Sequence, residues 1–194
     1  MAIRSLKSGS FSRSTQVGNS VILPGDYESI ATTTVGSGGA ASISFTSIPS
    51  TFTHLQVRAI LRNTAVTSGA SSVGFRLNSD SATNYTWHYL QGDGTSATAG
   101  AATGYTYAYM ALNINGGNTA NVWATTVLDI LDYTNTNKNK ILRSLGGYDN
   151  NGVGQIQLQS SAWLSTSAVT RIDIYPSASN FAQYSSFALY GIRG

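Results

Sequence analysis

Short segments in which apolar and polar residues alternate recur along this chain of 194 residues. The clearest runs from Thr53 to Arg62, THLQVRAILR. Successive side chains of a β-strand point to opposite faces of a sheet, so a period of two separates a buried face from a polar one. Segment 53–62 is therefore predicted to be a half-buried strand. Its core face carries Leu55, Val57 and Leu61, and its polar face, a candidate subunit contact, carries Gln56, Arg58 and Arg62.

The other alternating segments are bounded by turn residues, mainly Gly, Asn and Pro. Besides 53–62, the predicted strands are 27–35, 40–45, 73–77, 85–90, 105–114, 121–133, 141–147, 155–159, 169–175 and 186–192. The Gly-rich stretch 36–39 is predicted to join the first two of these strands in a hairpin. Stretch 92–104 consists mostly of Gly, Ala, Ser and Thr and is predicted to be a long loop. In segment 155–159, Ile156 and Leu158 are expected to face the core and the glutamines the opposite side.

The spacing of these strands predicts the fold class. No segment combines a helical period with caps, and no repeat of fixed length is present. Many short strands at intervals of about 8–12 residues are typical of sandwiches, so an all-β chain with a single β-sandwich or jelly-roll-like domain is predicted. An up-and-down barrel is the alternative. The expected organisation is an extended N-terminal arm over residues 1–25 and a β-sandwich domain over residues 26–194.

Composition and charge argue against several classes of function. The chain has no cysteine, which removes disulfides and thiolate metal sites and is compatible with folding in a reducing cytoplasm. The net charge is +3. Residues 1–25 hold three cations and no acid, so the remaining residues are neutral and their cations are scattered. This distribution argues against nucleic-acid binding. No apolar run predicts a membrane span or a signal peptide.

The N-terminal arm combines positive charge with spaced apolar residues. Its cations are Arg4, Lys7 and Arg13, and Phe11 is one of several apolar residues along it. These residues are predicted to tether the chain to a neighbouring subunit or to an acidic surface. A frayed terminus is the simpler alternative, because the ends of domains are commonly poorly ordered.

Few residues offer catalytic or metal-binding chemistry. His54 and His88 lack partners at the short spacings that metal sites use, and the Gly-x-Ser-x-Gly pattern of a nucleophile elbow is absent. A Ser-His-Asp triad assembled across the sequence stays open. A glycoside hydrolase would need two carboxylates, and Asp80 and Asp93 are the pair to test, although turn chemistry is the commoner role of such residues. We therefore predict no enzymatic activity, no metal site and no cofactor.

The most informative side chains form an aromatic group on both sides of stretch 92–104. The group consists of Tyr85, Trp87, Tyr89, Tyr105, Tyr107 and Tyr109. Aromatic faces next to polar amides are surfaces on which sugars or flat protein partners dock. Both phases of segment 85–90 carry large side chains, so we expect one face in the core and the other at an interface.

Three segments of the chain resemble a group of tailed-bacteriophage virion proteins. They are YESIATTTVGSGGAASISFTSIPSTFTHLQVR within residues 26–62, FRLNSDSATNYTWHYLQGDG at 75–94, and SFALYGIRG at the C-terminal end. The resemblance is to a pattern of strands and turns and carries no catalytic signature. It implies a β-sandwich used on virion surfaces, in proteins that are commonly trimeric.

The resemblance leads to one expected function and one alternative. The expected function is a structural virion protein that decorates and stabilises the capsid exterior, a cement protein, with the major capsid protein as its partner. A compact domain with an arm fits this role better than a fibre, which usually needs a long shaft. The alternative is a tail fibre, spike or other tail appendage that contacts tail proteins and binds host surface glycans. Either protein would be assembled in the host cytoplasm, be located in the virion and form a homo-oligomer, with a trimer expected.

Overall fold

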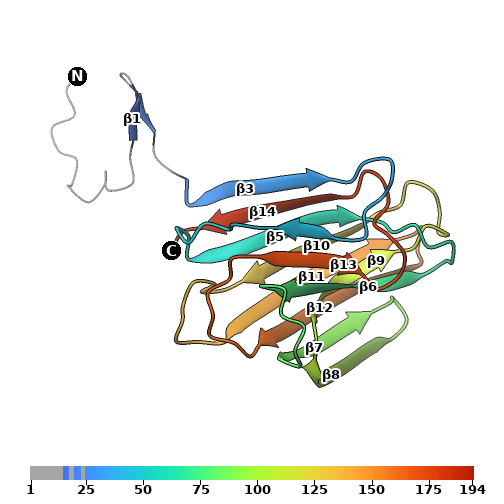
Figure 1. The fold of residues 1–194 in the computed structure, drawn as a ribbon. Coiled ribbons are helices and arrows are strands. Elements are labelled where there is room, and N and C mark those ends of the chain that lie inside the picture. Colours follow the sequence, from blue (N-terminus) through green and yellow to red (C-terminus); the bar gives the residue numbers. More distant parts are fainter. Residues whose placement is uncertain (1–14, 18–19, 23–24) are drawn as a thin grey trace, which may run out of the picture.

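The computed structural model describes residues 15–17, 20–22 and 25–194 and consists of two facing antiparallel sheets (Figure 1). The larger sheet has eight strands in the order β3 (Tyr27–Thr34), β14 (Ser186–Ile192), β5 (His54–Leu61), β10 (Ala124–Ile130), β11 (Lys140–Asp149), β12 (Gly154–Trp163), β7 (Tyr85–Gly92) and β8 (Ala97–Tyr105). The smaller sheet has four, in the order β4 (Ile43–Phe45), β13 (Ile172–Pro176), β6 (Ala70–Leu77) and β9 (Ala108–Ile114). Two short strands, β1 (Thr15–Val17) and β2 (Ser20–Ile22), pair with each other.

This architecture confirms the predicted all-β sandwich. The jelly-roll connectivity stays a prediction. The predicted tether residues Arg4, Lys7, Phe11 and Arg13 lie outside the described residues.

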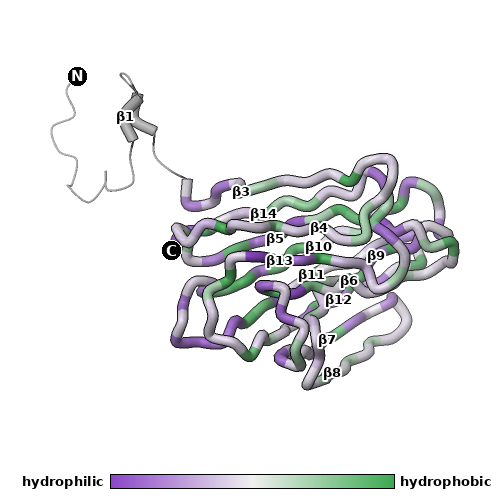
Figure 2. Tube along the Cα trace, in the orientation of Figure 1, coloured by the Kyte–Doolittle hydropathy of each residue, from purple (hydrophilic) through white to green (hydrophobic). Residues whose placement is uncertain are grey.

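The core lies between the two sheets and is built from the alternation predicted from the sequence. In β5, Leu55, Val57 and Leu61 are fully buried, as expected for the core face of segment 53–62. Phe75 of β6 and Ile174 of β13 are fully buried in the facing sheet. Figure 2 shows apolar and polar residues mixed along the strands of both sheets, which is the pattern of strands with one buried face.

The predicted hairpin between segments 27–35 and 40–45 is wrong. Strand β3 pairs with β14 in the larger sheet, and β4 pairs with β13 in the smaller sheet. The glycine-rich stretch 36–39 therefore lies on a connection between the two sheets. Turn residues indicate where a chain changes direction, but they do not determine which strands pair. Long-range packing determines the pairing, and here it places the C-terminal strand β14 between β3 and β5.

The predicted loop 92–104 is also wrong, because most of it forms strand β8 at the edge of the larger sheet. Its Ala, Gly and Thr residues give no contrast between two faces, so no periodicity marks the strand. A Cβ at Gly100 would lie 2.7 Å from Cε1 of Tyr89, so any larger residue would require the Tyr89 ring to shift. The predicted strand 105–114 is divided in turn: Tyr105 ends β8, and Ala108 begins β9 in the smaller sheet.

Strand β12 lies with its faces the opposite way round from the prediction. Ile156 and Leu158 are 60% and 48% exposed, whereas Gln159 is 2% exposed. The phase is fixed by Trp163 at the end of the strand, which is buried, stacks on Tyr85 and donates a hydrogen bond from Nε1 to Oδ2 of Asp80 (2.7 Å). Residues at even spacing from Trp163 therefore face inward, and these are the glutamines.

Two buried cations hold loops against the sandwich. The guanidinium of Arg62, 9% exposed, donates to the carbonyls of Gly116, Asn118, Thr119 and Val122 at 2.7–2.9 Å. Lys140 is fully buried and donates from Nζ to the carbonyls of Asn135, Lys138 and Thr166. Arg62 was predicted to lie on a subunit contact with Gln56 and Arg58, and this is wrong for Arg62, which is occupied inside the domain.

Candidate binding surfaces

Five of the six predicted aromatic residues come together where β7 and β8 extend past the smaller sheet. The ring of Trp87 lies 5.8 Å from Tyr89, 5.4 Å from Tyr105 and 5.2 Å from Tyr109. Tyr107 lies 5.2 Å from Tyr109. All five side chains are partly exposed, and we call them, together with Tyr175 below, the aromatic cluster.

Tyr85, the sixth predicted residue, is part of the core. It is fully buried, and its hydroxyl oxygen accepts a hydrogen bond from the backbone N–H of Leu77 (3.0 Å). Burial raises the pKa of its phenol well above the usual value. We expected strand 85–90 to have one face in the core and the other at an interface, and this holds only in part. Tyr85, Trp87 and Tyr89 lie on the same face of the strand, but only Tyr85 is buried in the core, whereas Trp87 and Tyr89 are partly exposed.

Tyr175 belongs to the aromatic cluster but was not predicted. Its ring lies 5.8 Å from Tyr107, and the guanidinium of Arg76 lies 5.2 Å above it. Arg76 also donates from Nε to the carbonyl of Thr106 (3.0 Å), which fixes the turn between β8 and β9. The alternation of Tyr175 with Ile172 and Ile174 was the available signal, because it places the tyrosine on the side opposite the core.

Two phenols of the cluster, those of Tyr109 and Tyr175, are neutral hydrogen-bonding groups. Burial raises the pKa of Tyr175 to about 12, and burial together with the neighbouring Tyr107 hydroxyl raises the pKa of Tyr109 still further. The hydroxyls of Tyr107 and Tyr109 lie 3.1 Å apart. Two buried polar atoms, Nε1 of Trp87 and the Tyr175 hydroxyl, have no hydrogen-bond partner among the described residues.

A row of amides lies beside the cluster on the same face of the sheet. Gln157 of β12 is directly opposite Gln91 of β7, and Gln159 is directly opposite Tyr89. The two facing amides are 3.4 Å apart. Aromatic rings next to amides provide a stacking surface and directional hydrogen bonds for sugar hydroxyls.

The outer face of the larger sheet, which points away from the smaller sheet, is unusually apolar. Large side chains there are about half exposed: Ile60 (52%), Leu90 (55%), Leu145 (51%), Ile156 (60%) and Leu158 (48%). The strand register places Leu145, Leu158 and Leu90 side by side in one row. A contiguous exposed apolar patch on a soluble domain marks an interaction site.

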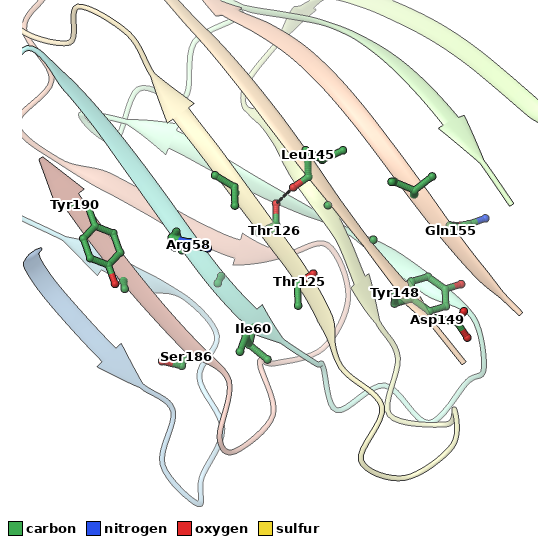
Figure 3. Close-up of a pocket in the computed structure, with 16 residues that line it drawn as sticks. Arg58, Ile60, Thr125, Thr126, Leu145, Tyr148, Asp149, Gln155, Ser186 and Tyr190 are labelled. Carbon is green, nitrogen blue, oxygen red and sulfur yellow. Dashed lines mark hydrogen bonds between the residues drawn. The ribbon is translucent and has the colours of Figure 1, made fainter. Parts of the chain in front are cut away.

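A hollow of about 880 Å³ lies in this face and is shown in Figure 3. It is lined by small residues such as Thr125 and Gly147 and by the larger side chains of Ile60, Leu145 and Ile156. Gly147 is required here, since a Cβ would lie 2.3 Å from the Gln155 carbonyl oxygen.

Charged and polar groups border the apolar face. Figure 3 shows Arg58 and Tyr190 on one side of the hollow and Asp149 on the other. The Tyr190 ring stacks on Tyr27 (4.6 Å), and the Tyr27 hydroxyl donates to Oε1 of Gln56 (2.8 Å). No carboxylate among the described residues lies within 4.0 Å of the Arg58 guanidinium, and Asp149 is in no ion pair with them.

The predicted carboxylate pair does not form a catalytic site. Asp80 and Asp93 lie at opposite ends of β7, whose eight residues span about 26 Å, whereas glycosidase carboxylates lie about 5–10 Å apart. Asp93 accepts hydrogen bonds from the N–H groups of Ser96 and Thr95, which lower its pKa to about 2. Both residues therefore organise turns.

The histidines also lie apart. His54 accepts a hydrogen bond at Nδ1 from the backbone N–H of Asp132 (3.0 Å), and His88 is exposed on the outer face. Within the described part of the chain, no three His, Asp or Glu side chains are placed to hold a metal ion. The same part of the chain contains no helix with the length and apolar character of a membrane span.

Replacing Asp80 with asparagine is expected to destabilise the domain by about 1–2 kcal/mol at pH 7, because the charge-assisted hydrogen bond from Trp163 is lost. Burial alone would raise the pKa of Asp80, but hydrogen bonds from Asn84, Trp163 and Ala82 hold the pKa below its usual value. The stabilisation is therefore present above about pH 4 and is lost as the pH falls through the lowered pKa.

The measurement is the urea midpoint of both proteins at pH 7 and pH 3. The difference between wild type and Asp80→Asn should shrink at the lower pH, and a constant difference would contradict this assignment. Ser81→Ala is the control, since this exposed neighbour is none of the three donors to the Asp80 carboxylate, which are Ala82, Asn84 and Trp163.

Comparison with known proteins finds no family model that matches the chain and no curated protein that is significantly similar to it.

Proposed function

We propose that this chain is a structural protein of a tailed-bacteriophage virion that decorates and stabilises the capsid exterior. The observation that carries the proposal is the apolar outer face of the larger sheet. Interfaces of stable assemblies have an apolar centre and a polar rim, and this face has both, with Arg58, Arg143, Asp129 and Asp149 around the apolar side chains. The sequence resemblance supplies the kind of assembly.

The size of the face also suits a subunit that binds to a large particle. Eight strands about 4.8 Å apart, each about 25 Å long, give an area on the order of 800 Å², which is the area per partner of a standard protein interface. A small domain that binds through such a face adds contacts between neighbouring capsid subunits and so stabilises the shell. The major capsid protein is the partner of this proposal.

A second candidate is a tail appendage that binds host surface glycans, and the aromatic cluster with its row of amides favours it. In this case Trp87, Tyr89, Tyr107 and the neighbouring Gln91 would contact the sugar. Glycan binding would be measured by titration of host surface polysaccharide, with Tyr89→Ala as the test variant. His88→Ala, on the opposite face of the same strand, is the matched control.

Electron microscopy of purified virions with this chain labelled tests the proposal. Label over the head supports capsid decoration. Label confined to the tail contradicts it and favours the appendage, and absence from the virion contradicts both.

A further inference from the structure

We propose that the outer face of the larger sheet binds a second copy of this chain, in a two-fold dimer in which Arg58 of each copy pairs with Asp149 of the other. This inference concerns the same surface as the proposed function but does not rest on it, because a second copy of the chain, in place of the major capsid protein, covers the face. It can be tested on the purified chain, without virions.

The first observation is that the two charges cannot pair within one chain. Arg58 is directly opposite Val127, and Val127 is directly opposite Leu145. Asp149 is four residues beyond Leu145 on β11. Two strand spacings and four residues separate Arg58 from Asp149, a distance of about 16 Å between Cα atoms. Each charge is exposed on the outer face and has no ion-pair partner among the described residues.

The second observation is that the midpoint between the two charges lies in the hollow, at Thr125. Thr125 is directly opposite both Ile60 and Gly147. Arg58 lies on the neighbouring strand β5, two residues from Thr125 towards one end of the sheet, and Asp149 lies on the neighbouring strand β11, two residues towards the other end. Thr125 is therefore the midpoint between them. A two-fold axis that lies in the plane of the interface, passes over Thr125 and runs at right angles to this line places each arginine against an aspartate.

The third observation is independent of the charges and concerns the apolar side chains. On strand spacings of about 4.8 Å and a rise of about 3.3 Å per residue, the same axis passes within about 6 Å of Leu145, Leu158, Leu90 and Ile156. The rotation that pairs the charges therefore also lays the apolar patch of one copy on the apolar patch of the other. An isologous interface requires this self-complementarity.

The hollow gives room for such an approach. Its floor of Thr125, Gly147, Ser186 and Ala188 is lined by small side chains, and the larger side chains of a second copy can occupy the space above it. Two sheets packed face to face are normally about 10 Å apart with their side chains interdigitated. This face carries both a hollow and projecting side chains, so the projecting side chains of one copy can interdigitate with the hollow of the other in a dimer.

The test is sedimentation equilibrium of the full chain over a range of concentrations, with charge variants. Wild type should reach the mass of two chains. Arg58→Glu and Asp149→Arg should each raise the dimer dissociation constant at least about tenfold, because like charges then face each other, and the double variant should return close to the wild-type value. Leu158→Ser should also weaken the dimer. Lys138→Glu, on an exposed loop away from this face, is the control and should leave it unchanged.

All four substituted residues are exposed, and far-UV circular dichroism and thermal unfolding check that each variant folds. A wild-type chain that stays monomeric at all concentrations overturns the proposal. A dimer insensitive to the single charge reversals, a double variant without rescue, or a trimer, which the sequence resemblance implies, overturns it equally. A monomer that nevertheless coats virion heads would leave the proposed function standing, whereas a dimer absent from virions would leave only this inference.

Discussion

Replacing Arg62 with alanine is expected to lower the free energy of unfolding by about 3–5 kcal/mol, the largest effect of any single substitution considered for this domain. The guanidinium donates to four carbonyls of the segment that links β9 to β10. Without it, these carbonyls lose a charged donor in a buried position and the segment loses its anchor to β5. Domains of this size are typically stable by about 5–15 kcal/mol, so a large part of the total would be lost.

Chemical denaturation monitored by tryptophan fluorescence measures this effect, and Arg143→Ala is the matched control. Arg143 is exposed, and its guanidinium lies 3.2 Å from Oδ2 of Asp129 on the surface, so its loss should cost about 1 kcal/mol or less. Equal losses from the two substitutions would contradict the anchoring role. Arg62→Lys should recover only part of the stability, since an ammonium has fewer donors than the fork of a guanidinium.

Replacing Lys140 with methionine is expected to cost about 2–3 kcal/mol. Methionine keeps most of the volume of the buried stem, so the substitution isolates the effect of the ammonium. That ammonium joins the carbonyls of Asn135 and Lys138 in one loop to the carbonyl of Thr166 in another. Its removal leaves both loops without their shared donor.

The control for this prediction is Lys138→Met, two residues away. Lys138 is exposed and its Nζ pairs with Oδ2 of Asp132 (2.7 Å), a surface ion pair that should contribute about 1 kcal/mol or less. Thermal unfolding of both variants gives the comparison. Unchanged stability of Lys140→Met would mean that water replaces the ammonium at all three carbonyls and would contradict the prediction.

The candidate surfaces were accessible to sequence reasoning to different degrees. The aromatic group was found because six rings lie close together in the sequence, and five of them do share one surface. Tyr175 lies far from them in the sequence and joins them only because β13 and β6 are neighbours in the smaller sheet. The apolar outer face was missed, because an exposed Ile or Leu at alternating positions has the same pattern as a buried one.

The alternation of short segments by itself determined that this chain forms strands and roughly where they lie, and it favoured a sandwich over an up-and-down barrel. It determined this because a period of two is a local property of extended backbone. Local pattern does not state which of two alternating faces is covered, so the tertiary structure decided that Leu55 is buried while Ile156 and Leu158 are exposed. The position of Trp163 in the register sets which residues of β12 face inward. The four strands of the smaller sheet cover only one face of the eight-stranded sheet, so the side chains on its other face stay exposed.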